Sequence, residues 1–123
     1  MRIAVIGLGY VGLPLALQFA RSGVTVVGLD IDPVKVKAIN QGRSYIGHLD
    51  GAAVTESVRA GHLEASIDFA RVREVEAVII CVPTPLNKNR EPDLSFILAT
   101  GRSIAPHLRR GVLVVLESTT YPG

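Results

Sequence analysis

Short apolar runs alternate along the chain with longer segments that carry apolar residues at helical spacing. The apolar runs predict buried β-strands at residues 2–6, 25–29, 77–82 and 112–116, and a weaker alternation predicts a short edge strand at 63–67. The helical spacing predicts helices at residues 11–22, 33–40 or 41, 51–60 and 94–105, with a helical turn at 69–72. No tight hairpin signal joins one strand to the next, so parallel strands connected by right-handed crossovers are the simplest topology.

Several residues mark the ends of these helices. Asp32, Asp50 and Asp93 are placed to cap the second, third and fourth helices, and Pro33 suits a first helical position. The first three helices are each followed by a glycine, a residue favoured just after a helix: Gly23, Gly42 and Gly61. In the last helix we expect one apolar face toward the sheet, made by Leu94, Ile97, Leu98, Gly101 and Ile104.

A glycine pattern lies where the first strand meets the first helix. Gly7-Leu8-Gly9-Tyr10-Val11-Gly12 matches G-x-G-x-x-G, which is weak alone but has here the strand–turn–helix context of a dinucleotide-binding turn. Gly7 permits the tight turn, Gly9 lets a pyrophosphate approach the backbone, and Gly12 lets the helix pack closely on the strand. The helix N-terminus offers unpaired N–H groups and a partial positive charge to the phosphates.

An acidic residue at the end of the second strand completes such a unit. Asp30 lies eighteen residues after Gly12, near the spacing at which a carboxylate binds the hydroxyl groups of an adenosine ribose. Asp32 competes for this role, although its place before Pro33 suits a helix cap better. A carboxylate at Asp30 favours NAD over NADP, because it accepts hydrogen bonds from a 2′-hydroxyl and repels a 2′-phosphate. Lys35, in the first turn of the next helix, could reach the same region.

The order of strands and helices predicts a Rossmann-type α/β fold, a doubly wound parallel sheet in which residues 1–123 form one dinucleotide-binding domain. The composition, 48% hydrophobic and 20% charged, fits a globular domain with a core. Residues 3–20 carry no charge, but Gly7, Gly9, Gly12 and Pro14 interrupt any long helix there, so we expect no membrane insertion. The net charge of +2 comes from interspersed charges, which gives no footprint for nucleic acid.

Two further loops are expected at the carboxyl edge of the sheet, where a dinucleotide binds. Residues 81–85 (CVPTP) follow the fourth predicted strand, and residues 117–123 (ESTTYPG) follow the last. Both loops supply hydroxyl groups and prolines, and either one alone fits an ordinary turn. Their occurrence beside one predicted crevice favours a functional role.

Cysteine and histidine offer little catalytic chemistry. One cysteine excludes a disulfide framework and gives no reason to place the protein in an oxidising compartment. Cys81 ends an apolar strand, so we expect a buried thiol rather than a nucleophile. The cysteine and histidines show no metal-ligand spacing, and we predict no metal. We expect ordinary surface loop residues at His48, Lys88, Asn89 and Arg90.

The segments GLGYVGLPLA, LDIDPVKV, CVPTPLNKNREPD and LESTTYPG together resemble the N-terminal domain of the UDP-glucose/GDP-mannose dehydrogenase family. The VPTP and ESTTYPG forms are most similar to the branch that oxidises UDP-N-acetylhexosamines. The resemblance covers essentially the whole chain, implies NAD as the cofactor, and places the last strand of the usual sheet beyond Gly123. It implies cofactor contacts at these residues: Gly7, Gly9, Tyr10, Val11, Gly12, Asp30, Lys35, Pro83, Thr84, Ser118 and Thr119.

The resemblance also implies a reaction. Family members oxidise the C6 hydroxyl of a nucleotide sugar to a carboxylate with two NAD, through capture of the aldehyde by a cysteine thiolate. Thr119 matches a threonine associated with positioning the hydrolytic water, whereas the catalytic cysteine, lysine and asparagine belong to regions outside this chain. We therefore expect the chain alone to be inactive, and the full-length protein to bind a UDP-sugar and to act in the cytoplasm as a homo-oligomer.

Two other interpretations remain open. A non-catalytic NAD-sensing regulatory domain shares the length, the glycine turn and the acidic residue, but it does not need the loops at 81–85 and 117–123. A hydroxyacid dehydrogenase of the six-phosphogluconate type shares the first strand–helix–strand unit and fits those two loops poorly.

Overall fold

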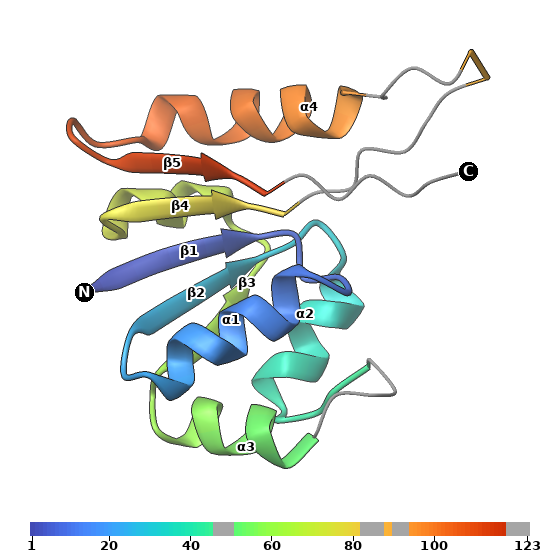
Figure 1. Ribbon diagram of the computed structural model, residues 1–123, viewed down its shortest axis with the longest axis vertical. Helices are drawn as coiled ribbons and strands as arrows, with labels where there is room; N and C mark the ends of the chain where they lie inside the picture. The colour runs from blue at the N-terminus through green and yellow to red at the C-terminus, as the bar shows by residue number, and fades with distance from the viewer. Residues whose placement is uncertain (46–50, 82–87, 90–93, 118–123) are drawn as a thin grey trace.

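The computed structural model describes residues 1–45, 51–81, 88–89 and 94–117. Within them a fully parallel sheet has the strand order β3-β2-β1-β4-β5 (Figure 1). The strands are β1 (Arg2–Ile6), β2 (Thr25–Leu29), β3 (Leu63–Ser66), β4 (Ala77–Ile80) and β5 (Leu113–Leu116). From β1 the chain adds β2 and β3 on one side of the sheet and then β4 and β5 on the other side. This change of direction between β1 and β4 leaves a crevice at the carboxyl ends of the strands. The predicted parallel topology is confirmed.

Helices cover both faces of the sheet, so the predicted doubly wound α/β fold is confirmed (Figure 1). The α-helices are α1 (Gly12–Arg21), α2 (Pro33–Asn40), α3 (Gly51–Arg59) and α4 (Ser95–Ile104), and the 3₁₀-helices are η1 (Phe69–Glu74) and η2 (Ala105–His107). Helices α1, α2 and α3 pack on one face, while η1 and α4 pack on the other. Among the helices described, none combines the length and apolar character needed to cross a lipid bilayer.

The alternation of side chains along the strands produces two cores. On the α1 face, Ile3, Val5 and Val26 pack with Leu13 and Leu17. On the α4 face, the core consists of Ala4, Ile6, Val27, Leu29, Val78 and Ile80 from the strands, with Val72, Val75 and Ile104 from the opposite layer. A sheet buried on both faces explains why its central strands are apolar at consecutive positions.

Two predicted helix signals have their expected geometry. The Asp32 carboxylate accepts a hydrogen bond from the Val34 N–H at 2.9 Å, and Pro33 is the first residue of α2. The glycines that follow α1, α2 and α3 all adopt positive φ. Asp68 caps η1 through the Ala70 N–H at 3.0 Å, and η1 extends two residues beyond the predicted turn.

The predicted buried face of the last helix is wrong in part, and the helix begins one residue later than predicted. Helix α4 begins at Ser95, after Leu94, and no side chain of the described residues caps it. The proposed caps Asp93 and Asp50 lie outside the described residues. Thr100 and Ile104 are buried, whereas Leu94 and Leu98 are about half exposed. The helix is rotated so that its Ile97, Thr100 and Ile104 stripe, rather than the Leu94 and Leu98 stripe, faces the sheet.

The prediction that 112–116 is a buried strand is also wrong in part. Strand β5 forms at Leu113–Leu116, but Leu113 is 62% exposed and Leu116 49%. Among the described strands β5 pairs only with β4, so it lies at an edge of the sheet. A run of apolar residues indicates a strand that favours the interior. The run does not show whether that strand will have a neighbouring strand on both sides.

At the opposite edge of the sheet, a side chain pairs with the backbone of one residue of β3. The Asn40 amide accepts a hydrogen bond from the Ala65 N–H and donates one to the Ala65 carbonyl, both at 2.9 Å. The backbone carbonyls of His62 and Ser66 accept hydrogen bonds from β2 and from Asp30 just after it. Because backbone groups alternate in direction along a strand, the N–H and carbonyl of Ala65 face away from β2. The Asn40 amide therefore takes the place of one residue of a further strand.

Replacement of Asn40 with alanine should lower the free energy of unfolding by about 1 kcal/mol, because two backbone groups of β3 lose their partner. Urea denaturation measures this change. Lys37→Ala, at an exposed position of the same helix, is the matched control and should change stability by less than about 0.5 kcal/mol. Equal stability of the two variants would show that the Asn40 bonds contribute nothing.

Candidate functional site

The turn between β1 and α1 is held by contacts that leave no room for side chains. Gly7 has φ of +93°, and its N–H donates to the Leu29 carbonyl at 2.8 Å. A Cβ added to Gly12 would lie 1.6 Å from the Gly7 carbonyl oxygen, far inside van der Waals contact. The roles predicted for Gly7 and Gly12, a tight turn and a close approach of helix to strand, match this geometry.

Gly9, between them, has the opposite environment. A Cβ added there would meet no atom of the described chain within 4 Å. The Gly9 carbonyl accepts the Leu13 N–H at 3.1 Å, whereas its own N–H donates to none of the described residues. No described side chain caps the start of α1, and the neighbouring Tyr10 and Val11 are 69% and 37% exposed. The turn therefore presents open backbone and the positive end of a helix dipole to the crevice.

Asp30 is buried directly beneath this turn. One carboxylate oxygen accepts the Leu8 N–H at 2.8 Å, and the other accepts the Asp32 N–H at 2.9 Å. Each carboxylate oxygen can accept a further hydrogen bond, so the group can still bind a hydroxyl of a ligand. Since Asp32 is engaged as the cap of α2, Asp30 is the acid that faces the turn, as the sequence favoured.

Tyr45 joins this site, although it was not among the predicted site residues. Its hydroxyl group donates to the Leu8 carbonyl, and Lys35 Nζ lies 5.9 Å from the centre of its ring, within the range of a cation–π contact. Burial, and then the charges of Asp30 and Asp32, raise the pKa of the Tyr45 phenol well above its ordinary value. Tyr45 therefore stays a protonated donor. Tyr45 carries no motif, and it follows Leu8 by 37 residues, so only the fold places the two together.

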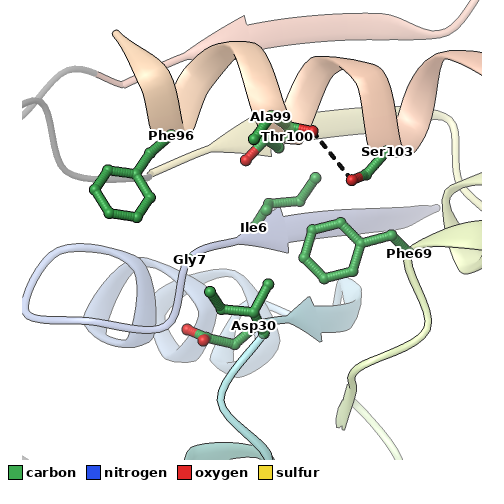
Figure 2. Close-up of a pocket in the computed structure, with 9 residues that line it drawn as sticks. Ile6, Gly7, Asp30, Phe69, Phe96, Ala99, Thr100 and Ser103 are labelled. Carbon is green, nitrogen blue, oxygen red and sulfur yellow. Dashed lines mark hydrogen bonds between the residues drawn. The ribbon is translucent and has the colours of Figure 1, made fainter. Parts of the chain in front are cut away.

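A small apolar pocket opens beside Asp30 on the α4 face of the sheet. Its volume is about 130 Å³, and it is lined by Ile6, Gly7, Asp30, Ile31, Phe69, Phe96, Ala99, Thr100 and Ser103. Figure 2 shows Phe69 and Phe96 on opposite sides of the pocket, with α4 above and Gly7 and Asp30 below. Two aromatic rings and an apolar floor suit a flat heterocycle. Sequence patterns did not identify this pocket, because its lining comes from β1, the end of β2, η1 and α4.

Cys81 has a structural position, as predicted. It is 6% exposed, its N–H donates to the Ile6 carbonyl at 2.7 Å, and its Cβ lies 3.4 Å from the position that a Cβ on Gly12 would take. Burial and the charge of Glu117 raise the pKa of the thiol to about 11. A thiol protonated at neutral pH is a poor nucleophile.

The remaining predicted site residues and the expected surface loop residues fall into two groups. Lys88 and Asn89 are exposed, as expected for a loop tip. The following lie outside the described residues: His48, Pro83, Thr84, Arg90, Ser118 and Thr119. Within the part of the chain that the structure describes, no group of three or more histidine, cysteine or acidic side chains could hold a metal ion.

Comparison with known proteins identifies the family of this chain. The UDP-glucose/GDP-mannose dehydrogenase family, NAD binding domain, matches residues 1–123. The UDP-N-acetyl-D-mannosamine dehydrogenase of Escherichia coli (strain K12) is 44% identical over 122 residues, which are 98% of this chain and 28% of that protein. The UDP-N-acetyl-D-glucosamine 6-dehydrogenase of Pseudomonas aeruginosa is 37% identical over 100% of this chain and 28% of that protein.

Solved structures agree with these relatives. The UDP-D-ManNAc dehydrogenase of Pyrococcus horikoshii superposes with a TM-score of 0.91 at 42% identity, over 100% of this chain and 29% of that chain. A ternary complex of GDP-mannose dehydrogenase from Pseudomonas aeruginosa gives a TM-score of 0.90 at 36% identity, again over 100% and 29%. The chain thus spans less than a third of the length of these proteins. It belongs to the UDP-glucose/GDP-mannose dehydrogenase family and corresponds to the domain of that family that binds NAD.

Proposed function

We propose that this chain forms the NAD site of a nucleotide-sugar dehydrogenase that oxidises the C6 hydroxyl of a UDP-sugar to a carboxylate with two NAD. The observation that carries the proposal is the turn between β1 and α1, where Leu8 and Gly12 are fixed by the protein and the space beside Gly9 is open. The substrate class rests on relatives named for UDP-N-acetylhexosamines, of which the chain covers 28%. We therefore propose a UDP-N-acetylhexosamine as the sugar.

The residues of the turn fit the diphosphate of NAD. The backbone at Gly9 can approach the phosphates without a side chain in the way, and the exposed Tyr10 and Val11 flank the same position. At the start of α1 the Gly12 N–H would donate to a phosphate oxygen, and the helix dipole favours the negative charge of the phosphates. The Leu13 N–H is already bonded to the Gly9 carbonyl, and Pro14 has no N–H. No described side chain competes as a cap at this position.

The adenosine half of the cofactor fits the space beside Asp30. With the diphosphate at Gly9, the adjoining ribose would lie against the Asp30 carboxylate, whose remaining acceptor capacity suits the ribose hydroxyl groups. Lys35, held against Tyr45, would supply a donor nearby. The adenine would then enter the pocket between Phe69 and Phe96, which begins at Asp30.

NAD supplies the acceptor for the hydride that leaves C6. We propose that Pro83, Thr84, Ser118 and Thr119 flank the nicotinamide end of the site, with Thr119 helping to position the hydrolytic water. Their place in the sequence supports this role, because they come soon after β4 and β5, and dinucleotides bind at the carboxyl ends of such strands.

We further propose that the full-length protein is a cytoplasmic homo-oligomer that binds its UDP-sugar mainly through regions outside this chain. A single, buried thiol is compatible with a reducing compartment. The alternative, a non-catalytic NAD-sensing regulatory domain, has no support, because the family and the relatives that match this chain are named as dehydrogenases.

Full-length protein should reduce two NAD for each UDP-N-acetylhexosamine consumed, whereas the 123-residue chain alone should reduce none. The first result is expected because oxidation of an alcohol to a carboxylate removes two hydrides. NADH absorbance, set against sugar consumed over a panel of UDP-hexoses and UDP-N-acetylhexosamines, measures the ratio. Turnover by the 123-residue chain, or a ratio of one, would contradict the proposal.

Gly9→Ala should weaken NAD binding by about tenfold or more and leave the fold intact, because the added methyl group enters open space that a diphosphate would fill. Gly12→Ala is the informative contrast. Its methyl group would overlap the Gly7 carbonyl, and we expect a loss of about 3 kcal/mol of stability or more. Calorimetric titration and thermal unfolding separate the two effects. Unchanged NAD affinity in the Gly9 variant would place the diphosphate elsewhere.

Cys81 in the folded protein should react with iodoacetamide at pH 8 at least about 100-fold more slowly than in urea. Raising the thiol pKa from 9.0 to about 11 lowers the thiolate fraction by about that factor, and burial limits access further. The neutral thiol is favoured by the fold, so this contribution to stability is present below the ordinary pKa and is lost as pH rises through about 11. Mass spectrometry of the single thiol follows the reaction, with the unfolded chain as its own control, and similar rates would assign Cys81 a reactive role.

A further inference from the structure

Leu8 is held within the glycine turn by contacts with β2 and with the segment after α2. Its N–H donates to Asp30 at the end of β2, and its carbonyl accepts from Tyr45 in the segment after α2. Its side chain is fully buried and would lie 2.9 Å from a Cβ on Gly28 of β2. The side chain, the N–H and the carbonyl of this one residue are therefore all fixed by contacts within the protein.

The carbonyl bond has a consequence for the next residue. In a trans peptide the carbonyl oxygen and the following N–H lie in one plane and point in opposite directions, and the described chain has no cis peptide bond. The bond from Tyr45 therefore turns the Gly9 N–H away from Tyr45. That N–H donates to no described residue, and the space beside Gly9 is open. A preset donor costs a ligand less than one that must be reoriented on binding.

The ring of Tyr45 makes a second contact. It packs against the α1 face core, and Lys35 Nζ lies 5.9 Å from its centre. Lys35 stands in the first turn of α2, just after Asp30 and Asp32. One side chain thus sets both the peptide at Gly9 and the ammonium group near the ribose position.

We propose that Tyr45 is a positioning residue for NAD, which orients the Gly9 N–H toward the diphosphate through its hydroxyl group and holds Lys35 beside the ribose through its ring. This proposal rests on the NAD site described above. Tyr45 acts through Leu8 and Lys35 and need not touch the cofactor.

Tyr45→Phe in the full-length protein isolates the hydroxyl group, because the ring and its contact with Lys35 are retained. We expect the Kd for NAD and for ADP-ribose to rise about 5-fold or more, with the KM for the UDP-sugar unchanged. Thr55→Val is the matched control. Thr55 Oγ1 donates to the Gly42 carbonyl at 2.6 Å, so this variant loses a comparable bond in the same part of the fold without touching Leu8.

If the role of the Tyr45 hydroxyl group were only structural, both variants would unfold at a lower temperature, and neither would change the Kd for NAD or for ADP-ribose. That result would overturn the proposal. If the unmodified protein bound no NAD, the proposed function would fail as a whole. If the unmodified protein bound NAD and the Tyr45 variant bound it equally well, only the role of Tyr45 would fail.

Amide exchange in the unmodified full-length protein gives an answer that does not depend on the folding of a variant. The Leu8 N–H, bonded to Asp30, should be protected with and without NAD. The Gly9 N–H should exchange freely in the absence of NAD and become protected when NAD binds. Continued free exchange of the Gly9 N–H at saturating NAD would overturn the proposal.

Discussion

The contact between the start of α1 and the end of β1 determines the geometry of this domain. A Cβ on Gly12 would lie 1.6 Å from the Gly7 carbonyl, so helix and strand approach to a distance that only backbone can occupy. This approach brings the start of the helix, with the Gly12 N–H, over the crevice at the carboxyl edge of the sheet. Cys81, the residue after β4, packs beneath the same contact and supports it from the neighbouring strand.

Asp30 connects that contact to ligand chemistry. An acid in this position is usually considered for what it offers a ribose, but here both oxygens already accept backbone N–H groups, from Leu8 and Asp32. These bonds hold the Asp30 side chain in its buried position and fix the glycine turn at the same time. Tyr45 completes the arrangement from the opposite side of Leu8. Binding geometry and fold stability thus share one small set of hydrogen bonds within the protein.

The sequence predicted those features that depend on local chemistry. Alternating apolar runs and helix signals located the strands and helices, and the glycine spacing located the turn, because close packing and positive φ restrict the residue type at a given position. Beyond the order of the sheet, several features that depend on which distant segments meet were missed or wrong. Tyr45 contacts Leu8 across 37 residues, and Phe69 and Phe96 face one pocket from separate elements. The exposure of Leu113 and the rotation of α4 depend on the neighbours of an element, which periodicity does not specify.

The two edges of the sheet differ in what they can accept. Asn40 occupies the outward backbone groups of Ala65 on β3, whereas on β5 Leu113 and Glu117 bond back to β4 and leave Val114 and Leu116 facing outward. The outward backbone groups of Val114 and Leu116 can pair with a further strand, so a segment that extends the sheet beside β5 needs no rearrangement of the five strands. Beside β3, a further strand would first have to displace the Asn40 amide from Ala65.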